Sequence, residues 1–332
     1  MLTAKGGPEV LVETDLPVTE PAGGEIRVAV RATGAGATDL MMRRGRYRFA
    51  PPLPFVPGYE AVGDVEAVGP GVTDLRIGDR VAALTVHGGY AEKLVRPAGD
   101  FVRVPDGLDD ADVVALILNY TTAYQAIHRT AAIRSGQTAL VTGASGGVGT
   151  AMLELLAVHG VRSFGAASAA RHELVRSLGA QPIDSRGGDI ADNLRAVVSA
   201  GVDVTFDGLG GRFVGPCIRA TRRGGTVVAY GFSGAARPDG TPSTAAMLRG
   251  AASLFVRAPL TGRRGRFYGI SLQYRKDPRP FRADLQTLFG LLARGAIRPR
   301  IAARLPLLAA RRAHELLERG GVEGKIVHLA GL

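Results

Sequence analysis

The sequence of 332 residues contains one cysteine, Cys217, and no tryptophan. A single cysteine excludes an intrachain disulfide and any zinc site built from several thiolates. No apolar run approaches the roughly 18 residues that a membrane span needs, and the first residues lack the apolar core of a secretory signal. Cys217 follows Pro216 in an apolar, helix-like stretch and is expected in a core. We therefore expect a cytoplasmic protein without a membrane span.

Acidic residues are also in deficit, 30 against 41 basic ones, which gives a formal net charge of +11. A basic surface could bind nucleic acid, because neutralising phosphates releases counterions. However, the arginines are scattered, with local clusters only at 219–223 and 263–279, and no helix-turn-helix, zinc finger or RNP motif accompanies them. We expect no nucleic-acid partner.

Two stretches of different pattern indicate two domains, as the length also suggests. In the first hundred residues, short β-branched runs alternate with Gly/Pro turns, which predicts a compact β domain with strands at 25–31, 61–68 and 80–84. From about Asp109, strand-like and helix-like segments alternate, which predicts a parallel, doubly wound α/β sheet. Its predicted strands are 138–142, 163–167, 202–207 and 226–230, with helices at 148–159 and 171–178. Further helices are predicted at 282–294 and 308–319.

A glycine-rich turn joins the first of these strands to a helix. Residues 143–149 read Gly-Ala-Ser-Gly-Gly-Val-Gly directly after the strand at 138–142. Glycines let the backbone turn tightly and approach a pyrophosphate, whose charge then lies at the free N–H groups of the helix start. Ala144 replaces the first glycine of the usual motif, so an ordinary strand-to-helix turn remains an alternative. The strand-turn-helix setting favours a dinucleotide site.

The end of the second strand decides between NADH and NADPH. An acidic residue there would bind the ribose 2′-hydroxyl of NAD, but the stretch 166–172 contains none. Ser168 and Arg171 offer a hydroxyl and a guanidinium, which suit a 2′-phosphate, so NADPH is the expected cofactor. Arg171 could instead be a solvent-exposed arginine at a helix start. Glu173 could bind the ribose 2′-hydroxyl, so NAD remains an alternative cofactor.

The turn also fits the motif of short-chain dehydrogenases, a second family to consider. Those enzymes place the turn near the N-terminus and need a Tyr-x-x-x-Lys pair. None of Tyr230, Tyr268 or Tyr274 is followed four residues later by lysine. This family is therefore excluded.

Over almost its whole length the sequence resembles the quinone oxidoreductase branch of the medium-chain dehydrogenase/reductases. Besides the glycine turn, the resemblance is carried by residues 34–39, 44–47, 57–63, 78–81, 122–124, 207–211 and 324–327. Residues 118–124 and 164–168 are most similar to the subgroup named for VAT-1. The resemblance implies a GroES-like catalytic domain (1–118 and 258–332), a Rossmann domain (119–257) and a homodimer.

Departures from the zinc enzymes of this superfamily predict a protein without metal. Where those enzymes carry a cysteine and a histidine ligand, this chain has Gly36 and Tyr59. Without a Lewis acid, hydride transfer to a quinone or an α,β-unsaturated carbonyl is favoured over alcohol oxidation, because the conjugated acceptor delocalises the developing charge. Quinone reductases usually carry asparagine at the position of Gly36, so an amide that could contact nicotinamide or substrate is missing.

The resemblance assigns two catalytic candidates, Tyr47 as proton donor or oxyanion partner and Asp39 near the nicotinamide end. Tyr47 could instead pack its ring at a loop base, Asp39 could serve structural hydrogen bonds, and Tyr59 could fill the volume of a metal. Thr122 is expected to reach the cofactor, with an exposed hydroxyl on a helix surface as the alternative. The expected cofactor contacts are Thr122, Ala144, Ser145, Gly146, Gly147, Val148, Ser168, Arg171, Gly208, Gly231 and Phe232.

Two functions from different classes fit these features. One is an NADPH-dependent reductase of a small quinone or enone. The other is an NADPH-binding protein with little turnover, which the VAT-1-like subgroup and Gly36 make plausible.

Overall fold

A computed structural model describes residues 1–47, 49–235 and 243–332. The chain forms two compact units, unit 1 (Met1–Thr121 and Tyr274–Leu332) and unit 2 (Thr122–Gln273). The second boundary lies after the position expected from sequence, because strand β11 (Arg264–Phe267) pairs with β10 (Thr221–Ala229) in the sheet of unit 2. None of the helices in the described ranges combines the length and apolar character needed to cross a bilayer.

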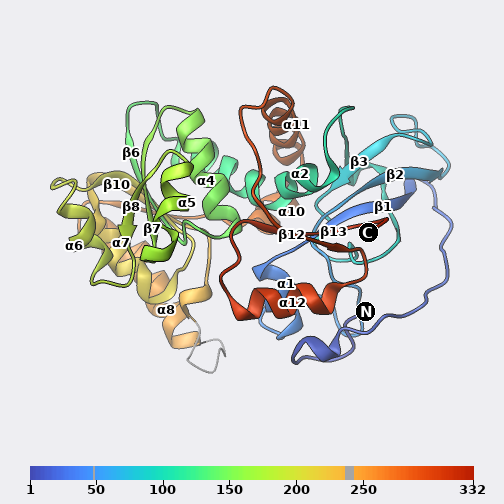
Figure 1. Ribbon diagram of the computed structural model, residues 1–332, viewed down its shortest axis with the longest axis horizontal. Coiled ribbons are helices and arrows are strands. Elements are labelled where there is room, and N and C mark those ends of the chain that lie inside the picture. Colours follow the sequence, from blue (N-terminus) through green and yellow to red (C-terminus); the bar gives the residue numbers. More distant parts are fainter. Residues whose placement is uncertain (48, 236–242) are drawn as a thin grey trace. The chain divides into compact units, whose positions relative to one another are not determined.

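Unit 1 is built on a sheet in the order β12-β13-β1-β2-β3-β5, with β4 also paired to β1 (Figure 1). Strand β1 is antiparallel to β2, β4 and β13, whereas β12 and β13 are parallel. The C-terminal stretch thus completes the sheet begun by the N-terminal one. The strands are β1 (Glu25–Ala35), β2 (Ala61–Val68), β3 (Arg80–Ala83), β4 (Lys93–Pro97), β5 (Phe101–Arg103), β12 (Ile301–Pro306) and β13 (Lys325–Leu329).

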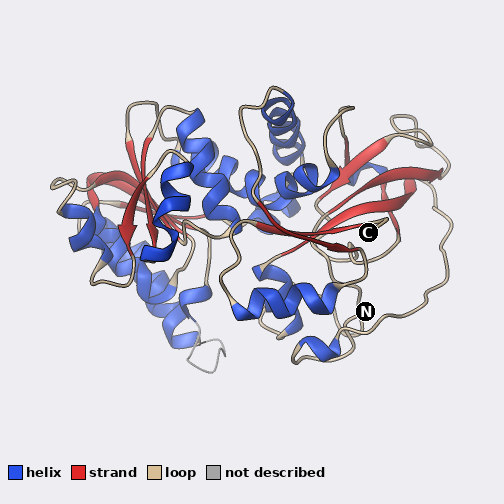
Figure 2. Ribbon diagram, in the orientation of Figure 1, coloured by secondary structure: helices blue, strands red, loops and turns tan. Residues whose placement is uncertain are grey.

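Alternating side chains of β1 form the centre of the core of unit 1. Ile26, Val28 and Val30 are buried and pack with Val65 and Val81, which is the period of two expected of a half-buried strand. Several helices of unit 1 lie next to this sheet (Figure 2). They are α1 (Ala37–Arg43), α2 (Asp110–Ala115), the π-helix η3 (Leu116–Tyr120), α11 (Arg279–Ala293) and α12 (Ala310–Arg319).

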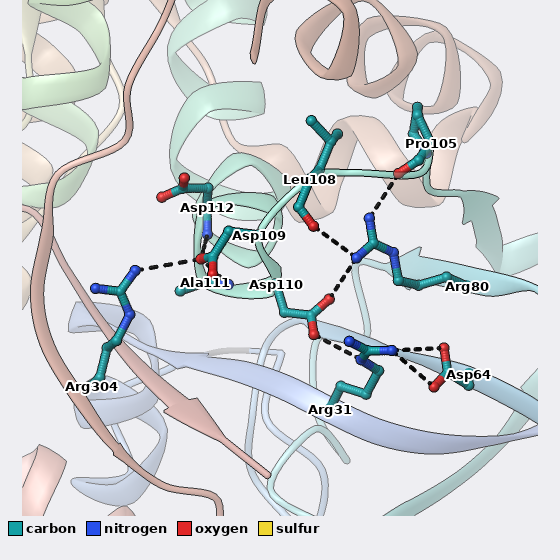
Figure 3. Close-up of polar contacts among 10 residues, drawn as sticks. All are labelled: Arg31, Asp64, Arg80, Pro105, Leu108, Asp109, Asp110, Ala111, Asp112 and Arg304. Atoms are coloured by element: carbon teal, nitrogen blue, oxygen red, sulfur yellow. Dashed lines mark hydrogen bonds and ion pairs between the residues drawn. The ribbon is translucent and has the colours of Figure 1, made fainter. Parts of the chain in front are cut away.

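Acidic residues fix the start of α2 to the sheet of unit 1 (Figure 3). The side chain of Asp109 caps the helix by accepting hydrogen bonds from the backbone N–H groups of Ala111 and Asp112. Asp110 accepts from Arg31 Nε of β1 at 2.7 Å and from Arg80 Nη1 of β3 at 3.2 Å. The helix therefore begins where two strands present arginines.

Unit 2 is a parallel sheet in the order β11-β10-β9-β6-β7-β8. Helices α4 and α5 cover one face and α6 and α7 the other (Figure 1). This is the doubly wound α/β arrangement predicted from the sequence, and that prediction is confirmed. The strands are β6 (Thr138–Thr142), β7 (Arg162–Ala167), β8 (Gln181–Asp184), β9 (Val202–Asp207), β10 and β11. The flanking helices are α4 (Gly147–Val158), α5 (His172–Ser177), α6 (Ile190–Arg195) and α7 (Val214–Ala220).

The core of unit 2 is formed by apolar side chains of its strands, of which β6 and β7 were predicted from the sequence and β8 was not. Leu140 of β6, Phe164 of β7 and Ile183 of β8 are buried against Leu194 of α6. Cys217 lies fully buried in α7, as expected of a small core residue. Helical segments follow β10 at α8 (Thr244–Ala252), η8 (Ser253–Arg257) and α9 (Ala258–Leu260), and lead to β11.

Candidate active site and cofactor site

The glycine turn follows β6 directly and leads into α4. Gly143 has a φ of +65°, a conformation that side chains rarely adopt, and Gly146 is the N-cap of α4. A Cβ at Gly149 would overlap the carbonyl of Gly143, so the first helical turn packs directly on the loop. The N–H groups at this helix start can therefore face a phosphate, with Ala144, Ser145, Gly147 and Val148 in the same turn.

The end of β9 lies beside this turn, since β6 and β9 are neighbours in the sheet. Asp207 is buried and its Oδ1 accepts from Thr142 Oγ1 at 2.8 Å and from the N–H groups of Leu209 and Gly210. Burial raises the pKa of Asp207, and these hydrogen bonds act in the opposite direction. The network holds Gly208 next to Thr142, its N–H donating to Thr142 Oγ1 at 3.1 Å.

Strand β10 brings Gly231 and Phe232 to the same edge. A Cβ at Gly231 would overlap the carbonyl of Gly208, so glycine is needed for this backbone contact. The ring of Phe232 is 44% exposed and lies 5.4 Å from that of Phe267, centroid to centroid. The order of the strands reverses between β6 and β9, the place where doubly wound sheets bind ligands beyond their carboxyl ends.

Strand β7 places Ser168 and Arg171 at this edge as well. Ser168 follows the strand and its carbonyl accepts from the Arg171 N–H at 2.8 Å, which fixes Arg171 at the start of α5. Glu173, the possible ribose ligand, forms an exposed ion pair with Arg176 at 3.3 Å. The stretch 166–172 at the end of β7 itself contains no acidic residue, and the donors Ser168 and Arg171 suit a 2′-phosphate.

Thr122 begins unit 2 in the helix α3 (Thr121–Gln125), where it is 6% exposed. The alternative of a hydroxyl on an exposed helix surface is therefore wrong. Burial alone does not give Thr122 a cofactor contact, which stays a prediction.

In unit 1, the hydroxyl groups of Tyr47 and Tyr59 are 2.6 Å apart and hydrogen-bonded. Tyr59 is 1% exposed, and the ring centroids of the two tyrosines lie 6.0 Å apart in an edge-on arrangement. The neighbouring Phe49 contacts the Tyr47 ring and stacks with the guanidinium of Arg275. Contacts of both its hydroxyl and its ring therefore hold Tyr47 in place. Tyr59 fills the space expected for a metal and also orients the Tyr47 hydroxyl.

Asp39 belongs to a second cluster, with Glu60 and Lys325. All three are buried, and Lys325 Nζ forms an ion pair with Glu60 Oε1. Asp39 Oδ2 accepts from the Gly36 N–H at 3.0 Å at the start of α1, and Glu60 Oε2 accepts from the Leu118 N–H at 2.9 Å. Burial raises the pKa of Asp39 to about 7 and also raises that of Glu60, while Lys325 lowers both. The structural role of Asp39 is therefore visible, and its catalytic role stays a prediction.

Two glycines line this cluster with opposite consequences. A Cβ at Gly34 would overlap the Glu60 carboxylate and the Lys325 side chain, so these groups approach each other only because residue 34 has no side chain. A Cβ at Gly36 would meet nothing closer than Lys325 Nζ at 3.8 Å and Asp39 Oδ2 at 4.0 Å. Gly36 therefore leaves open space beside Lys325 and Asp39.

The residues at the zinc position do not fit a zinc ion. Tyr59 donates or accepts a hydrogen bond with Tyr47, Gly36 has no side chain, and Cys217 is buried in the other unit. Across the described ranges, no group of three or more His, Cys, Asp and Glu side chains could hold a metal ion.

Sequence reasoning missed the Glu60–Lys325 pair and the bond between Tyr47 and Tyr59. Both Glu60 and Lys325 stand in motifs that carry the resemblance, but they are 265 positions apart, and only the pairing of β13 with β1 brings them together. Nothing in local spacing signals such a contact.

Comparison with known proteins identifies the family. The profile of the alcohol dehydrogenase GroES-like domain matches residues 22–106, and that of zinc-binding dehydrogenases matches residues 178–327. Rat quinone oxidoreductase is 30% identical over 98% of this chain and 95% of its own length. The rat synaptic vesicle membrane protein VAT-1 homolog is 37% identical over 70% of this chain, but the match spans only 59% of that protein.

A solved structure agrees over the whole fold. Escherichia coli quinone oxidoreductase in complex with NADPH superposes with a TM-score of 0.85 at 27% identity, covering 99% of this chain and 98% of that one. Unit 1 thus has the GroES-like fold and unit 2 the nucleotide-binding fold of these enzymes. The chain belongs to the medium-chain dehydrogenase/reductase superfamily, in the branch that contains the quinone oxidoreductases and VAT-1 homologues.

Proposed function

We propose that this chain is an NADPH-dependent reductase that transfers hydride, without metal, to a quinone or an α,β-unsaturated carbonyl compound. The observation that carries the proposal is the carboxyl edge of the sheet of unit 2, where the glycine turn, Gly208, Ser168 and Arg171 gather. The NADPH complex of the E. coli quinone oxidoreductase and the name of the rat relative support it.

The residues of the edge fit this cofactor. NADPH, when bound, supplies a hydride from C4 of its nicotinamide. Gly143 and Gly149 allow the backbone approach that a pyrophosphate needs, and the start of α4 provides N–H donors. Arg171 supplies a guanidinium for the 2′-phosphate, with Ser168 as a second donor. The acceptor gains the hydride and one proton, which Tyr47 or water provides.

Tyr47 supports the reaction at the acceptor. Its hydroxyl can donate one hydrogen bond to the oxygen on which negative charge develops. The hydroxyl of Tyr59 lies 2.6 Å away and limits the positions of the Tyr47 ring and hydroxyl, so this donor is pre-oriented. Such pre-orientation lowers the reorganisation needed when charge appears.

A second function, NADPH binding with little turnover, is favoured by Gly36. The open space at its Cβ position shows that no side chain acts there. Steady-state NADPH oxidation with a panel of quinones, enones and saturated ketones separates the two. Turnover with conjugated acceptors and none with saturated ketones supports the reductase, whereas measurable NADPH binding without any turnover supports the second function.

Cofactor selection is tested with Arg171→Ala, with Arg176→Ala on the same helix as the matched control. Loss of charge-assisted hydrogen bonds to a 2′-phosphate should weaken NADPH binding by roughly 1–3 kcal/mol and leave NADH nearly unchanged. Titration calorimetry with both cofactors measures this. Equal losses for both cofactors would show that Arg171 serves the fold.

A homodimeric state and a cytoplasmic location, both expected from the sequence, belong to the same proposal.

A further inference from the structure

A polar recess lies in unit 2 at the amino ends of its strands. It has a volume of about 180 Å³ and is lined in part by Arg134, Arg222, Arg264 and Asp203. Asp203 stands at the start of β9 and Arg264 at the start of β11, whereas the glycine turn follows the last residue of β6. The recess and the cofactor edge are therefore at opposite ends of the same sheet, and nothing in the proposed reaction uses the recess.

The backbone of β10 shapes one wall of the recess. The register of β10 against β9 shifts between Thr221 and Thr226, so the residues between them bulge from the ladder. Two of these, Gly224 and Gly225, line the recess, and Gly224 has a φ of +77°. The bulge also carries Arg222, which places a guanidinium at the rim.

Two of the lining arginines are held in place by the fold. Arg222 Nε donates to Asp203 Oδ1 at 2.7 Å, and Asp203 Oδ2 accepts from the backbone N–H and the hydroxyl of Thr138, both at 2.8 Å. Arg264 donates to Thr226 Oγ1 at 3.1 Å and to the carbonyl of Gly224 at 3.0 Å. In the part of the chain that the structure describes, Arg264 thus donates only to neutral acceptors, and Asp203 can offset no more than one arginine.

The third lining arginine is Arg134. Within the described ranges, the guanidinium of Arg134 donates no hydrogen bond, although its backbone N–H is bound by Gln137. Three guanidinium groups against one carboxylate leave the lining with two uncompensated positive charges. Arg263, the residue before Arg264, also has basic neighbours, since burial together with the charges of Arg195 and Arg223 lowers its pKa. The arrangement matches a doubly charged oxyanion, which guanidinium groups bind through paired hydrogen bonds.

We propose that this recess is a second anion site, which binds a phosphate group, free or as part of a small phosphomonoester. A volume of about 180 Å³ is several times the roughly 30 Å³ that a water molecule occupies in the liquid, so a tetrahedral oxyanion fits with room for a short organic group. Because the site is remote from the turn at Gly143, it would be occupied independently of the cofactor.

The test is a ³¹P NMR titration of inorganic phosphate with the full chain, at constant ionic strength with chloride as the balancing anion. Wild type should bind one phosphate saturably, and Arg134→Gln should weaken this binding by about tenfold or more. Arg266→Gln, on the same strand as Arg264 but outside the recess, should change it less than about twofold. A repeat with glycerol 3-phosphate separates the sources: tighter binding indicates a phosphomonoester, and equal binding indicates free phosphate.

Three results would overturn the proposal. One is the absence of saturable binding. Another is equal weakening of phosphate binding by Arg134→Gln and Arg266→Gln. If both variants also weaken the binding of a DNA duplex equally, the basic residues form a diffuse surface for polyanions rather than a site. The third is loss of phosphate binding in Arg171→Gln but not in Arg134→Gln, which places the anion at the cofactor edge instead.

Discussion

In the proposed reaction, Tyr47 and Arg171 are the two side chains with the most specific tasks, one at the acceptor and the other at the 2′-phosphate. The type of each side chain indicated its chemistry, a neutral donor and a cation for phosphate, and the structure places Arg171 at the expected strand end. The partner of Tyr47 was not predictable, because Tyr59 reaches it through a folded loop rather than through regular spacing. Asp39 was expected either near the reacting end or in structural hydrogen bonds; its bond from the Gly36 N–H shows the structural role, and spacing could not reveal its burial near Lys325.

The hydroxyl of Tyr47 should matter to the transition state rather than to cofactor binding. Tyr47→Phe keeps the ring and its contact with Phe49, so we expect the turnover of an enone to fall about tenfold to hundredfold while NADPH affinity is unchanged. With a quinone the loss should be smaller, because an aromatising product holds its own charge. Initial rates with both acceptors measure this.

Tyr59→Phe is the matched control, because it removes the bond between the two hydroxyls but leaves the Tyr47 donor. Its effect on enone turnover should lie between wild type and Tyr47→Phe. If Tyr47→Phe reduced both acceptors at the wild-type rate, Tyr47 would be only a wall of the site, and solvent would supply the proton.

Among the elements, the strands with apolar or β-branched runs were predicted to within a few residues, including β2, β6 and β9. Strand β11 was missed, because Arg264–Phe267 contains two arginines and a glycine and no alternating apolar pattern. Its ladder to β10 brings Arg264–Phe267 into unit 2, which runs to Gln273, whereas the sequence led us to expect a domain end at residue 257. Tertiary pairing overrides local propensity in both cases.

The surroundings of two nearby glycines, one in β1 and one just after it, predict different effects of alanine substitution on stability. Gly34 pairs with Val327 of β13, and a Cβ there would overlap Glu60 and Lys325. Gly34→Ala should therefore lower the free energy of unfolding by roughly 1–3 kcal/mol through overpacking. Gly36→Ala is the control, because Gly36 has a φ of −155° and open space where a Cβ would lie. The free energy of unfolding of this variant should stay within about 0.5 kcal/mol of the wild-type value.

Chemical denaturation monitored by circular dichroism measures both variants. Equal stability of Gly34→Ala and wild type would contradict the close approach of the ion pair to β1. A loss in Gly36→Ala as large as in Gly34→Ala would show that the space next to Lys325 is not open.

On the scale of the molecule, two buried histidines of unit 1 contribute to the dependence of stability on pH. Burial lowers the pKa of His314 to about 3 and that of His328 to about 4, from an ordinary value of 6.5. The folded state therefore binds fewer protons than the unfolded chain below pH 6.5, and their contribution to stability is lost as pH falls towards 4. Asp39 acts in the opposite sense, since a pKa raised to about 7 costs stability as pH rises from about 4 to 7.

His314→Gln tests this dependence. Its amide can still bond to the hydroxyl of Tyr90, which lies 3.3 Å from His314 Nε2, but it does not titrate. The variant should be less stable than wild type at pH 7, and the difference should shrink as pH falls from 6.5 to 4. The measurement is the free energy of unfolding of both proteins at several pH values. A difference between wild type and His314→Gln that does not depend on pH would contradict a buried neutral imidazole.

The direct test of hydride transfer follows the hydrogen itself. NADPH carrying deuterium at the transferable C4 position is incubated with the protein and an enone, and the product is analysed by mass spectrometry and NMR. The account predicts one deuterium per product molecule, on the carbon β to the carbonyl, with a hydrogen from solvent on the α-carbon. An unlabelled product, or deuterium on the carbonyl carbon of an allylic alcohol, would contradict it.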